Sequence, residues 1–313
     1  MSYYPPAMPV EPVPLGVADA QGVVTTDLPC RKCSYNLRGL TIEGRCPECG
    51  AAVGLSVQGD LLRFADPTWV RTLARGVRQI IWGIVVIVLG GILAAVLAAT
   101  IPAIGLVVLV LPLVGYILIL VGTWRLTEPD PSGLGEDQYG TSRQLIRITL
   151  ILGVIDALLD VVKELVTVPP VVSVALLFLA VLFGIAAIVG LFAQLQYLKK
   201  LALRIPDAKL AGRAHFLMYG LGIGYGLLAL MGASMALAIR FGPGPAAGGG
   251  TATIMTALGC SMGVMGLAVL VFAIMFLLLL ERMGKRFGME AQLAEATWAR
   301  IGDAAPPVQP AIP

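Results

Sequence analysis

The uninterrupted apolar stretch VVSVALLFLAVLFGIAAIVGLFAQLQ, residues 171–196, decides the fold class of this chain. It carries no charged side chain and exceeds the ~20 residues that a helix needs to cross the ~30 Å hydrocarbon core of a bilayer. Five further runs have a similar length: residues 80–99, 103–123, 145–166, 215–239 and 254–280. We therefore predict an all-α polytopic membrane protein with a six-helix transmembrane bundle within residues 79–280.

The composition of the 313-residue chain supports a membrane protein. Hydrophobic residues make up 58% of the chain and charged residues 13%, against roughly 25% charged residues in soluble domains. A soluble protein of this length needs more charge to cover its surface, so the composition argues against an ordinary cytosolic enzyme. The net charge of +3 is small and gives no reason to expect nucleic acid as a partner.

The basic residues fall on alternate connections between the apolar runs. If the N-terminus lies inside, all of the 22 Lys and Arg residues except Lys163 and Arg240 lie in cytoplasmic segments. Basic residues favour cytoplasmic loops, so we predict six spans of the cytoplasmic (inner) membrane with both termini in the cytoplasm. The charged run at 145–166 could instead lie on the inner surface. That arrangement would place the basic residues of 199–213 outside, so we favour the crossing.

The segments outside the spans differ in composition from them. Residues 1–28 and 303–313 are rich in proline, so we expect a disordered arm and a disordered tail. Residues 66–78 and 281–302 place apolar side chains on one helical face and charged side chains on another. This pattern predicts amphipathic helices at the inner membrane surface. For residues 66–78, a plain extension of the first transmembrane helix is an equally good interpretation.

Four cysteines lie close together in the segment CRKCSYNLRGLTIEGRCPECG, residues 30–50. Each Cys-x2-Cys pair can present two thiolates to one ion, and four thiolates satisfy the tetrahedral preference of zinc. We predict a structural Zn²⁺ site in a small cytoplasmic zinc ribbon at residues 29–52, with four ligands: Cys30, Cys33, Cys46 and Cys49. Iron could occupy the same ligands, while the reducing cytoplasm disfavours disulfides.

A closed four-cysteine site leaves no open coordination position for water or substrate, so the predicted site is structural rather than catalytic. The neighbouring basic residues would offset the negative charge of the four thiolates; they are Arg31, Lys32, Arg38 and Arg45. Contact with nucleic acid is the less favoured interpretation of these charges, because Tyr35 is the one aromatic residue nearby. We expect the ribbon to be either a structural module or a module that docks a cytoplasmic protein.

The cysteine segment resembles a known group of proteins. Its pattern Cys-x2-Cys-x-Tyr-x-Leu-x-Gly-Leu, followed by Cys-Pro-Glu-Cys-Gly, is similar to the zinc-ribbon head of bacterial multi-span membrane proteins of unassigned function. The resemblance continues in Asp66-Pro67-x-Trp69 with Leu73 and Gly76, and more loosely in Trp124-Arg125-Leu126-Thr127 with Asp130-Pro131. It covers about a third of the chain and implies an architecture but no reaction.

The charged residues of the third run are candidates for an intramembrane polar site. Asp156, Asp160 and Glu164 are four residues apart and share a helix face, and Lys163 can pair with Asp160. If Arg147 marks the inner interface, Asp156 lies near mid-bilayer, where a carboxylate is a candidate proton or cation site. A polar group that serves packing is the favoured alternative, because no other run supplies an obvious matching acid or base.

The remaining motifs point to packing rather than chemistry. His215 has no evident partners, and residues 259–263 match Gly-x-Ser-x-Gly inside an apolar helix instead of a strand-turn-helix. Pairs such as Gly220 with Gly224 let helices approach closely, within one chain or between copies in a homo-oligomer.

We therefore predict a protein that is not an enzyme. Its helices would form an anchor or scaffold in the lipid bilayer for the zinc ribbon. The alternative is a small transporter or channel that uses Asp156 and Asp160, and an intramembrane enzyme is the third candidate.

Overall fold

The computed structural model describes residues 16–97, 105–133, 136–166, 169–205, 208–241 and 248–303. Within these ranges the chain is helical and contains turns and isolated bridges but no strand. The predicted all-α class is therefore confirmed. The helices are α1 (Val53–Val57), the short 3-10 helix η1 (Leu62–Phe64), α2 (Pro67–Leu97), α3 (Gly105–Leu126), α4 (Glu136–Leu165), α5 (Pro170–Ala202), α6 (Ala208–Phe241) and α7 (Gly248–Asp303).

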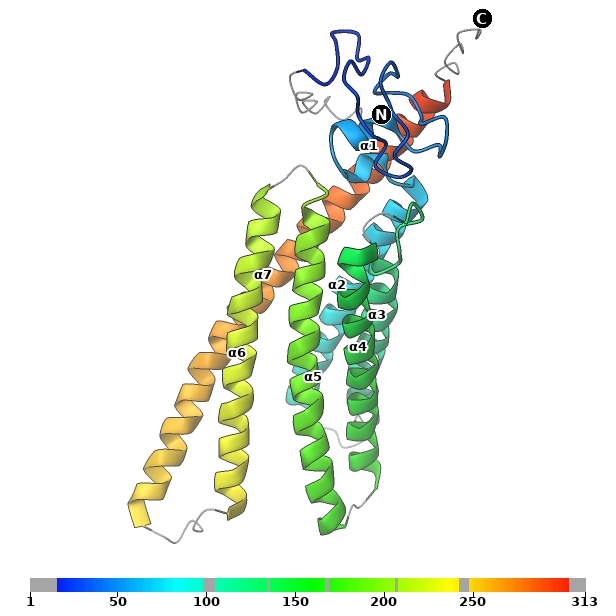
Figure 1. The fold of residues 1–313 in the computed structure, drawn as a ribbon. Helices are drawn as coiled ribbons and strands as arrows, with labels where there is room; N and C mark the ends of the chain where they lie inside the picture. Colours follow the sequence, from blue (N-terminus) through cyan, green and yellow to red (C-terminus); the bar gives the residue numbers. More distant parts are fainter. Residues whose placement is uncertain are drawn as a thin grey trace, which may run out of the picture.

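The long helices form a ring. Each of the helices α2 to α6 packs against the next in sequence, and α7 returns to pack against α2 (Figure 1). Residues 16–65, here called the head, lie at one end of the ring beside the last turns of α7. Both ends of the described chain therefore meet at the same end of the molecule.

Within the described residues, four segments are long and apolar enough to cross a membrane: Pro67–Leu93, Val172–Ala202, Gly212–Gly232 and Gly259–Gly302. The apolar segment Val110–Leu126 of α3 is shorter, and the charged helix α4 is not among the four. These findings support membrane association. They leave the count of six spans as a prediction.

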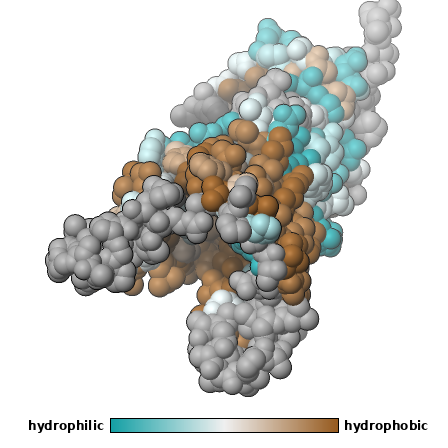
Figure 2. Space-filling view, turned by 90° about the horizontal axis from the view of Figure 1, so that it is seen from below, coloured by the Kyte–Doolittle hydropathy of each residue, from teal (hydrophilic) through white to brown (hydrophobic). Residues whose placement is uncertain are grey.

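Burial divides the ring into two halves. Toward the head, large side chains such as Leu198, Leu217 and Phe287 form a buried core that joins α2, α5, α6 and α7. Away from the head, large apolar side chains are exposed, including Phe178, Leu230 and Val264. Figure 2, viewed from that end, shows hydrophobic residues over the near surface and hydrophilic residues around the head. Exposed apolar surface of this extent is stable in lipid and not in water.

Glycines bring α2 and α3 into backbone contact. A Cβ atom added at Gly76 would lie 2.6 Å from the carbonyl oxygen of Gly122, and one at Gly83 would lie 2.8 Å from that of Gly115. Side chains at these positions would separate the helices. Of the pair predicted from the sequence, Gly220 faces Phe272 and Gly224 faces Val269 on α7.

The two segments predicted as amphipathic surface helices continue directly into longer helices. Residues 66–78 include the first turns of α2, and residues 281–302 belong to the last part of α7. Asp66 caps α2, because its carboxylate accepts hydrogen bonds from the N–H groups of Thr68 and Trp69 at 2.7 and 3.2 Å. The hydrogen bonds from Thr68 hold the pKa of the Asp66 carboxyl below its usual value. Residues 67–78 are thus the first turns of the long helix α2.

The head has a small core of its own. Val24, Leu37 and Val53 are almost fully buried and pack around Cys30 and Cys46. Residues 16–28 therefore fold with the head, although the sequence placed them in the disordered arm; residues 1–15 lie outside the described ranges. The backbone of the head pairs through four isolated antiparallel bridges and forms no named strand. The predicted cysteine cluster is present, whereas the zinc ribbon stays a prediction.

Candidate metal centre

Two turns with one hydrogen-bond pattern present the four cysteines. In knuckle 1, residues 29–36, the Ser34 N–H donates to the Cys30 carbonyl at 2.8 Å and the Cys30 N–H to the Tyr35 carbonyl at 2.7 Å. In knuckle 2, residues 45–52, Gly50 donates to Cys46 at 2.9 Å and Cys46 to Ala51 at 2.8 Å. The same spacing of Cys-x2-Cys thus gives the same fold twice.

The residue after the second cysteine of each knuckle closes the turn. Ser34 has a φ of 64° and Gly50 a φ of 69°, in the left-handed region that favours glycine. Ser34 is the one non-glycine residue with positive φ in the described part of the chain. Glycine is the usual residue in this conformation, whereas a serine at position 34 gives no such signal in the sequence.

The four sulfur atoms are close enough to share one ion. All four Sγ atoms lie within 4.8 Å of one another. Cys30 and Cys49 are 3.7 Å apart, and Cys33 and Cys46 are 3.5 Å apart. A tetrahedral zinc site with Zn–S bonds of about 2.3 Å has S–S edges of about 3.8 Å. The predicted ligands therefore meet at one point and fit a tetrahedral metal ion. The fifth cysteine, Cys260, is exposed on α7 and is not part of the cluster.

Burial and hydrogen bonds shift the pKa values of the cysteine thiols in opposite directions. Burial acts to raise the pKa of Cys30, but the N–H groups of Lys32 and Cys33 and the neighbouring thiols lower it to about 7. At Cys33 the Tyr35 N–H lowers the pKa, while burial and three neighbouring sulfurs raise it to about 12. The pKa shifts of Cys30 and Cys33 are thus opposite in direction, and a bound metal would require its thiol ligands to lose their protons.

The two knuckles differ in what covers them. Residues 31–36 of knuckle 1 are exposed, whereas in knuckle 2 Ala52 is buried and Cys49 and Ala51 are partly buried. The Arg45 guanidinium of knuckle 2 lies 5.2 Å from the ring centre of Trp298 on α7. The indole N–H of Trp298 donates to the Ala65 carbonyl at 3.0 Å. Helix α7 therefore contacts one side of knuckle 2, whose other residues are exposed, and leaves residues 31–36 of knuckle 1 open.

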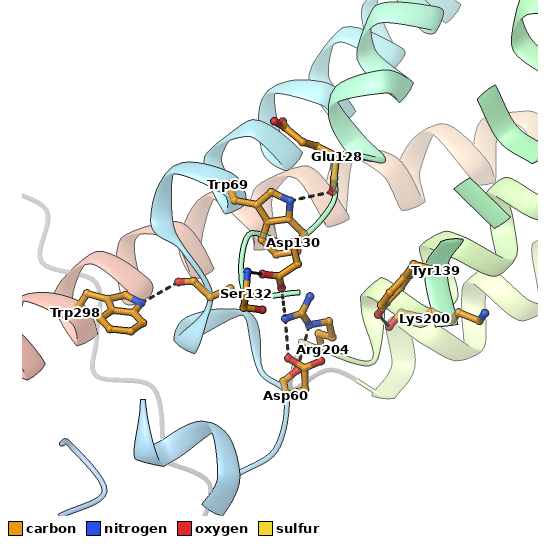
Figure 3. Close-up of polar contacts among 10 residues, drawn as sticks. Asp60, Trp69, Glu128, Asp130, Ser132, Tyr139, Lys200, Arg204 and Trp298 are labelled. Atoms are coloured by element: carbon orange, nitrogen blue, oxygen red, sulfur yellow. Dashed lines mark hydrogen bonds and ion pairs between the residues drawn. The ribbon is translucent and has the colours of Figure 1, made fainter. Parts of the chain in front are cut away.

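A buried arginine fastens the head to the helices. Arg204, at the end of α5, is in contact with Asp60 at 2.6 Å and with Asp130 at 2.8 Å, and its side chain is 6% exposed (Figure 3). Its backbone carbonyl accepts a hydrogen bond from the Leu62 N–H at 3.0 Å. These residues, here called the arginine joint, connect the head, the α3–α4 connection and the end of α5.

Trp69 completes the arginine joint on the side of α2. The Arg204 guanidinium lies 5.2 Å from its ring centre, and its indole N–H donates to the Glu128 carbonyl at 3.0 Å. Burial acts to lower the pKa of Arg204, but Asp60 and Asp130 raise it above its ordinary value. The charge is therefore retained in the buried position, and two carboxylates compensate it. The sequence did not predict this joint.

The predicted intramembrane site is brought together in part. Lys163 donates to Asp160 at 2.8 Å, and both side chains remain partly or largely exposed on α4. Asp156 is partly buried, and Asp160 and Lys163 of its own helix are the charged groups that act on it. The side chain of Glu164 lies outside the described part of the structure. The arrangement is a local ion pair on one helix.

The two motifs that the sequence assigned to packing contain no catalytic arrangement in the described residues. His215 packs edge to face on Tyr219, with ring centres 5.1 Å apart. Residues 259–263 lie within the continuous helix α7, so Ser261 does not occupy the strand-turn-helix that a nucleophile elbow requires.

Comparison of the chain with models of protein families, with curated proteins and with solved structures gives no match. The resemblance to zinc-ribbon membrane proteins is therefore carried by its motif alone. What the structure itself provides is a cysteine cluster that can hold a metal ion and helices that can cross a membrane.

Proposed function

We propose that this chain is a multi-pass protein of the cytoplasmic membrane whose head binds one structural Zn²⁺ and docks a cytoplasmic protein. Both termini lie in the cytoplasm, and the helices are the anchor. The proposed role needs no catalysis. The single observation that carries it is the unequal covering of the two knuckles: one is held by the helices while residues 31–36 of the other face solvent.

The donor set and its geometry support zinc. Four thiolates at tetrahedral spacing favour Zn²⁺ or iron over Mg²⁺ and Ca²⁺, which prefer oxygen ligands. Zinc has no redox chemistry and commonly occupies closed four-cysteine sites as a purely structural ion. Bound there, zinc would fix both knuckles around one point, which small heads with few buried side chains need for a stable fold.

The docking surface would be centred on knuckle 1. Tyr35 is 39% exposed, and Arg31, Lys32 and Arg38, which are close to it in the sequence, are exposed as well. A cavity of about 300 Å³ lies beside it, between Lys32, knuckle 2 and Trp298. Exposed tyrosine and arginine side chains on a rigid frame are typical of protein-binding surfaces, because little conformational entropy is lost on binding.

Cross-linked co-purification from native membranes tests the docking role. We would compare the intact chain with Arg31→Ala/Tyr35→Ala, and use Arg282→Ala/Met289→Ala as the control; Met289 on α7 is also 39% exposed. A protein that co-purifies with the intact chain and the control, but is lost with the knuckle 1 variant, supports docking. Equal recovery in all three samples would refute it.

The transporter alternative depends on Asp156. Since Asp160 is already bonded to Lys163 at 2.8 Å, the local ion pair accounts for part of the predicted site without transport. Asp156→Asn in proteoliposomes separates the two roles. Loss of a proton or cation flux in this variant, together with normal co-purification, would favour transport over docking.

A further inference from the structure

A groove of about 530 Å³ lies between α2 and α7 on the side of the ring that carries the head. Its walls are the first turns of α2 and the part of α7 that follows its apolar segment. The groove is separate from the cysteine cluster and from the arginine joint, because none of its lining residues belongs to either.

Basic side chains from both helices line this groove. Arg71, Arg75 and Arg78 are spaced by four and three residues, so they follow one face of α2, and Lys285 comes from α7. Arg71 is paired with Glu295, and Lys285 is paired with Glu281 at 2.6 Å. Among the described residues, no ion pair joins a carboxylate to Arg75 or Arg78.

The floor of the groove is apolar and made of small residues. It includes Ala74 and Val77 from α2 and Gly284, Gly288 and Ala291 from α7. Gly284 packs against Val77, whereas a Cβ atom added at Gly288 would meet nothing within 4 Å. The space above Gly288 is therefore open. An occupant of this groove meets cations at its rim and hydrocarbon below.

The groove lies where the apolar surface of the protein begins. Trp82 is 60% exposed and follows Arg78 by about one helical turn. On α7 the last exposed apolar residue before Glu281 is Leu278. The groove is thus level with the transition from apolar to charged surface, at which phospholipid headgroups lie.

We propose that this groove binds one anionic phospholipid, with its headgroup phosphate between Arg75 and Arg78. An acyl chain would leave the groove past Val77 and Ile81 toward the membrane, while the rest of the headgroup would lie in the open space over Gly288 on the side of the head. A soluble anion would use the arginines but leave the floor uncovered, so the combination favours a lipid. The proposal needs only that α2 and α7 cross a membrane, and it does not depend on the role of the head.

Native mass spectrometry of the full-length detergent-solubilised protein tests the proposal. Phosphatidylglycerol and phosphatidylcholine are titrated separately, and inorganic phosphate is added as a competitor. We expect one tightly bound phosphatidylglycerol and weaker binding of phosphatidylcholine. The double variant Arg75→Gln/Arg78→Gln loses two surface cations and should bind phosphatidylglycerol about thirtyfold more weakly. Arg75→Lys/Arg78→Lys should retain most of the affinity.

Two further variants separate charge from shape. Arg125→Gln/Arg282→Gln removes the same charge from the same end of the helices outside the groove, and should change the affinity less than twofold. Gly288→Leu fills the open space without a change in charge and should also weaken binding. Equal losses in the two arginine double variants, or unchanged binding in Gly288→Leu, would overturn the proposal. Displacement of the lipid by millimolar phosphate would assign the site to a soluble anion instead.

Discussion

Knuckle 1 and knuckle 2 have the same backbone hydrogen bonds and the same positive φ at their last turn residue, but they lie in different surroundings. Residues 31–36 of knuckle 1 face solvent, whereas knuckle 2 is partly exposed and contacts α7 through Arg45, Ala51 and Ala52. The local geometry is therefore a property of the Cys-x2-Cys spacing, whereas the surroundings are a property of the whole fold. The difference teaches that metal binding and attachment to the helices can be disturbed separately.

Loss of one thiolate from either knuckle should have the largest effect. Cys33→Ser and Cys49→Ser each leave three sulfur ligands, and structural zinc contributes about 10–16 kcal/mol to the folding of small zinc domains. We expect both variants to lose metal and to become sensitive to protease within the head. Metal content per chain and limited proteolysis measure this, with Cys260→Ser as the control. A Cys49 variant that kept its metal would show that α7 can replace a ligand.

The next largest effect is expected at the arginine joint. Arg204→Met leaves the buried Asp130 and the partly buried Asp60 without a cation, and loss of one partner costs about 3–5 kcal/mol in comparable buried pairs. Faster hydrogen exchange at residues 58–65 should follow, while metal content stays at one per chain. The control is Arg300→Met, because its contact with Glu43 at 3.4 Å is exposed and contributes less than about 1 kcal/mol. Loss of metal in the Arg204 variant would contradict independent metal binding and attachment.

Trp298→Ala should loosen knuckle 2 alone. The variant loses the hydrogen bond to Ala65 and the contact with Arg45, together about 2 kcal/mol for a partly buried tryptophan. Hydrogen exchange should become about thirtyfold faster in peptides that cover knuckle 2 and remain unchanged in those that cover knuckle 1. Trp82→Ala, on the exposed apolar part of α2, serves as the control. Equal acceleration in both knuckles would mean that α7 supports the whole head.

The smallest effect concerns the turn residues. Gly50→Ala places a Cβ in open space, so its cost of about 1 kcal/mol comes from the positive φ alone. Ser34→Gly should stabilise the metal-bound head by less than about 1 kcal/mol. Glycine removes the steric strain of a positive φ, but it also loses more conformational entropy on folding than serine. Competition with a chelator measures both changes. A loss of the same size in both variants would show that Ser34 has a further contact that its turn requires.

The parts of the molecule that local sequence encodes were predicted well. Long apolar runs define helices, and two Cys-x2-Cys pairs define a cluster whose four sulfurs do lie together. The turn at Gly50 has a local signal because glycine is the usual residue at such a φ, whereas Ser34 gives no such signal. Residues 16–28 were placed in the disordered arm because they follow the proline-rich residues 5–14, although the burial of Val24 includes them in the head.

Long-range contacts could not be predicted from the sequence. Arg204 meets Asp130 and Asp60 across 74 and 144 residues, and nothing in their neighbouring residues identifies them as partners. As one basic residue among 22, Arg204 served only as a topology signal. The contacts of Gly76 with Gly122 and of Gly83 with Gly115 likewise depend on which helices are neighbours.

The distance along the chain between Ala65 and Trp298 sets an order of events during synthesis. Their contact spans 233 residues, so the head leaves the ribosome well before the part of α7 that contacts it has been synthesised. At about 5–20 residues per second, the delay is roughly 10 to 50 seconds. The hydrogen bonds of the knuckles are local and need no later residue, so the head can take up metal during this interval. A chain released before α7 is complete would therefore carry a metal-loaded head that is held by the arginine joint but lacks the contacts with α7.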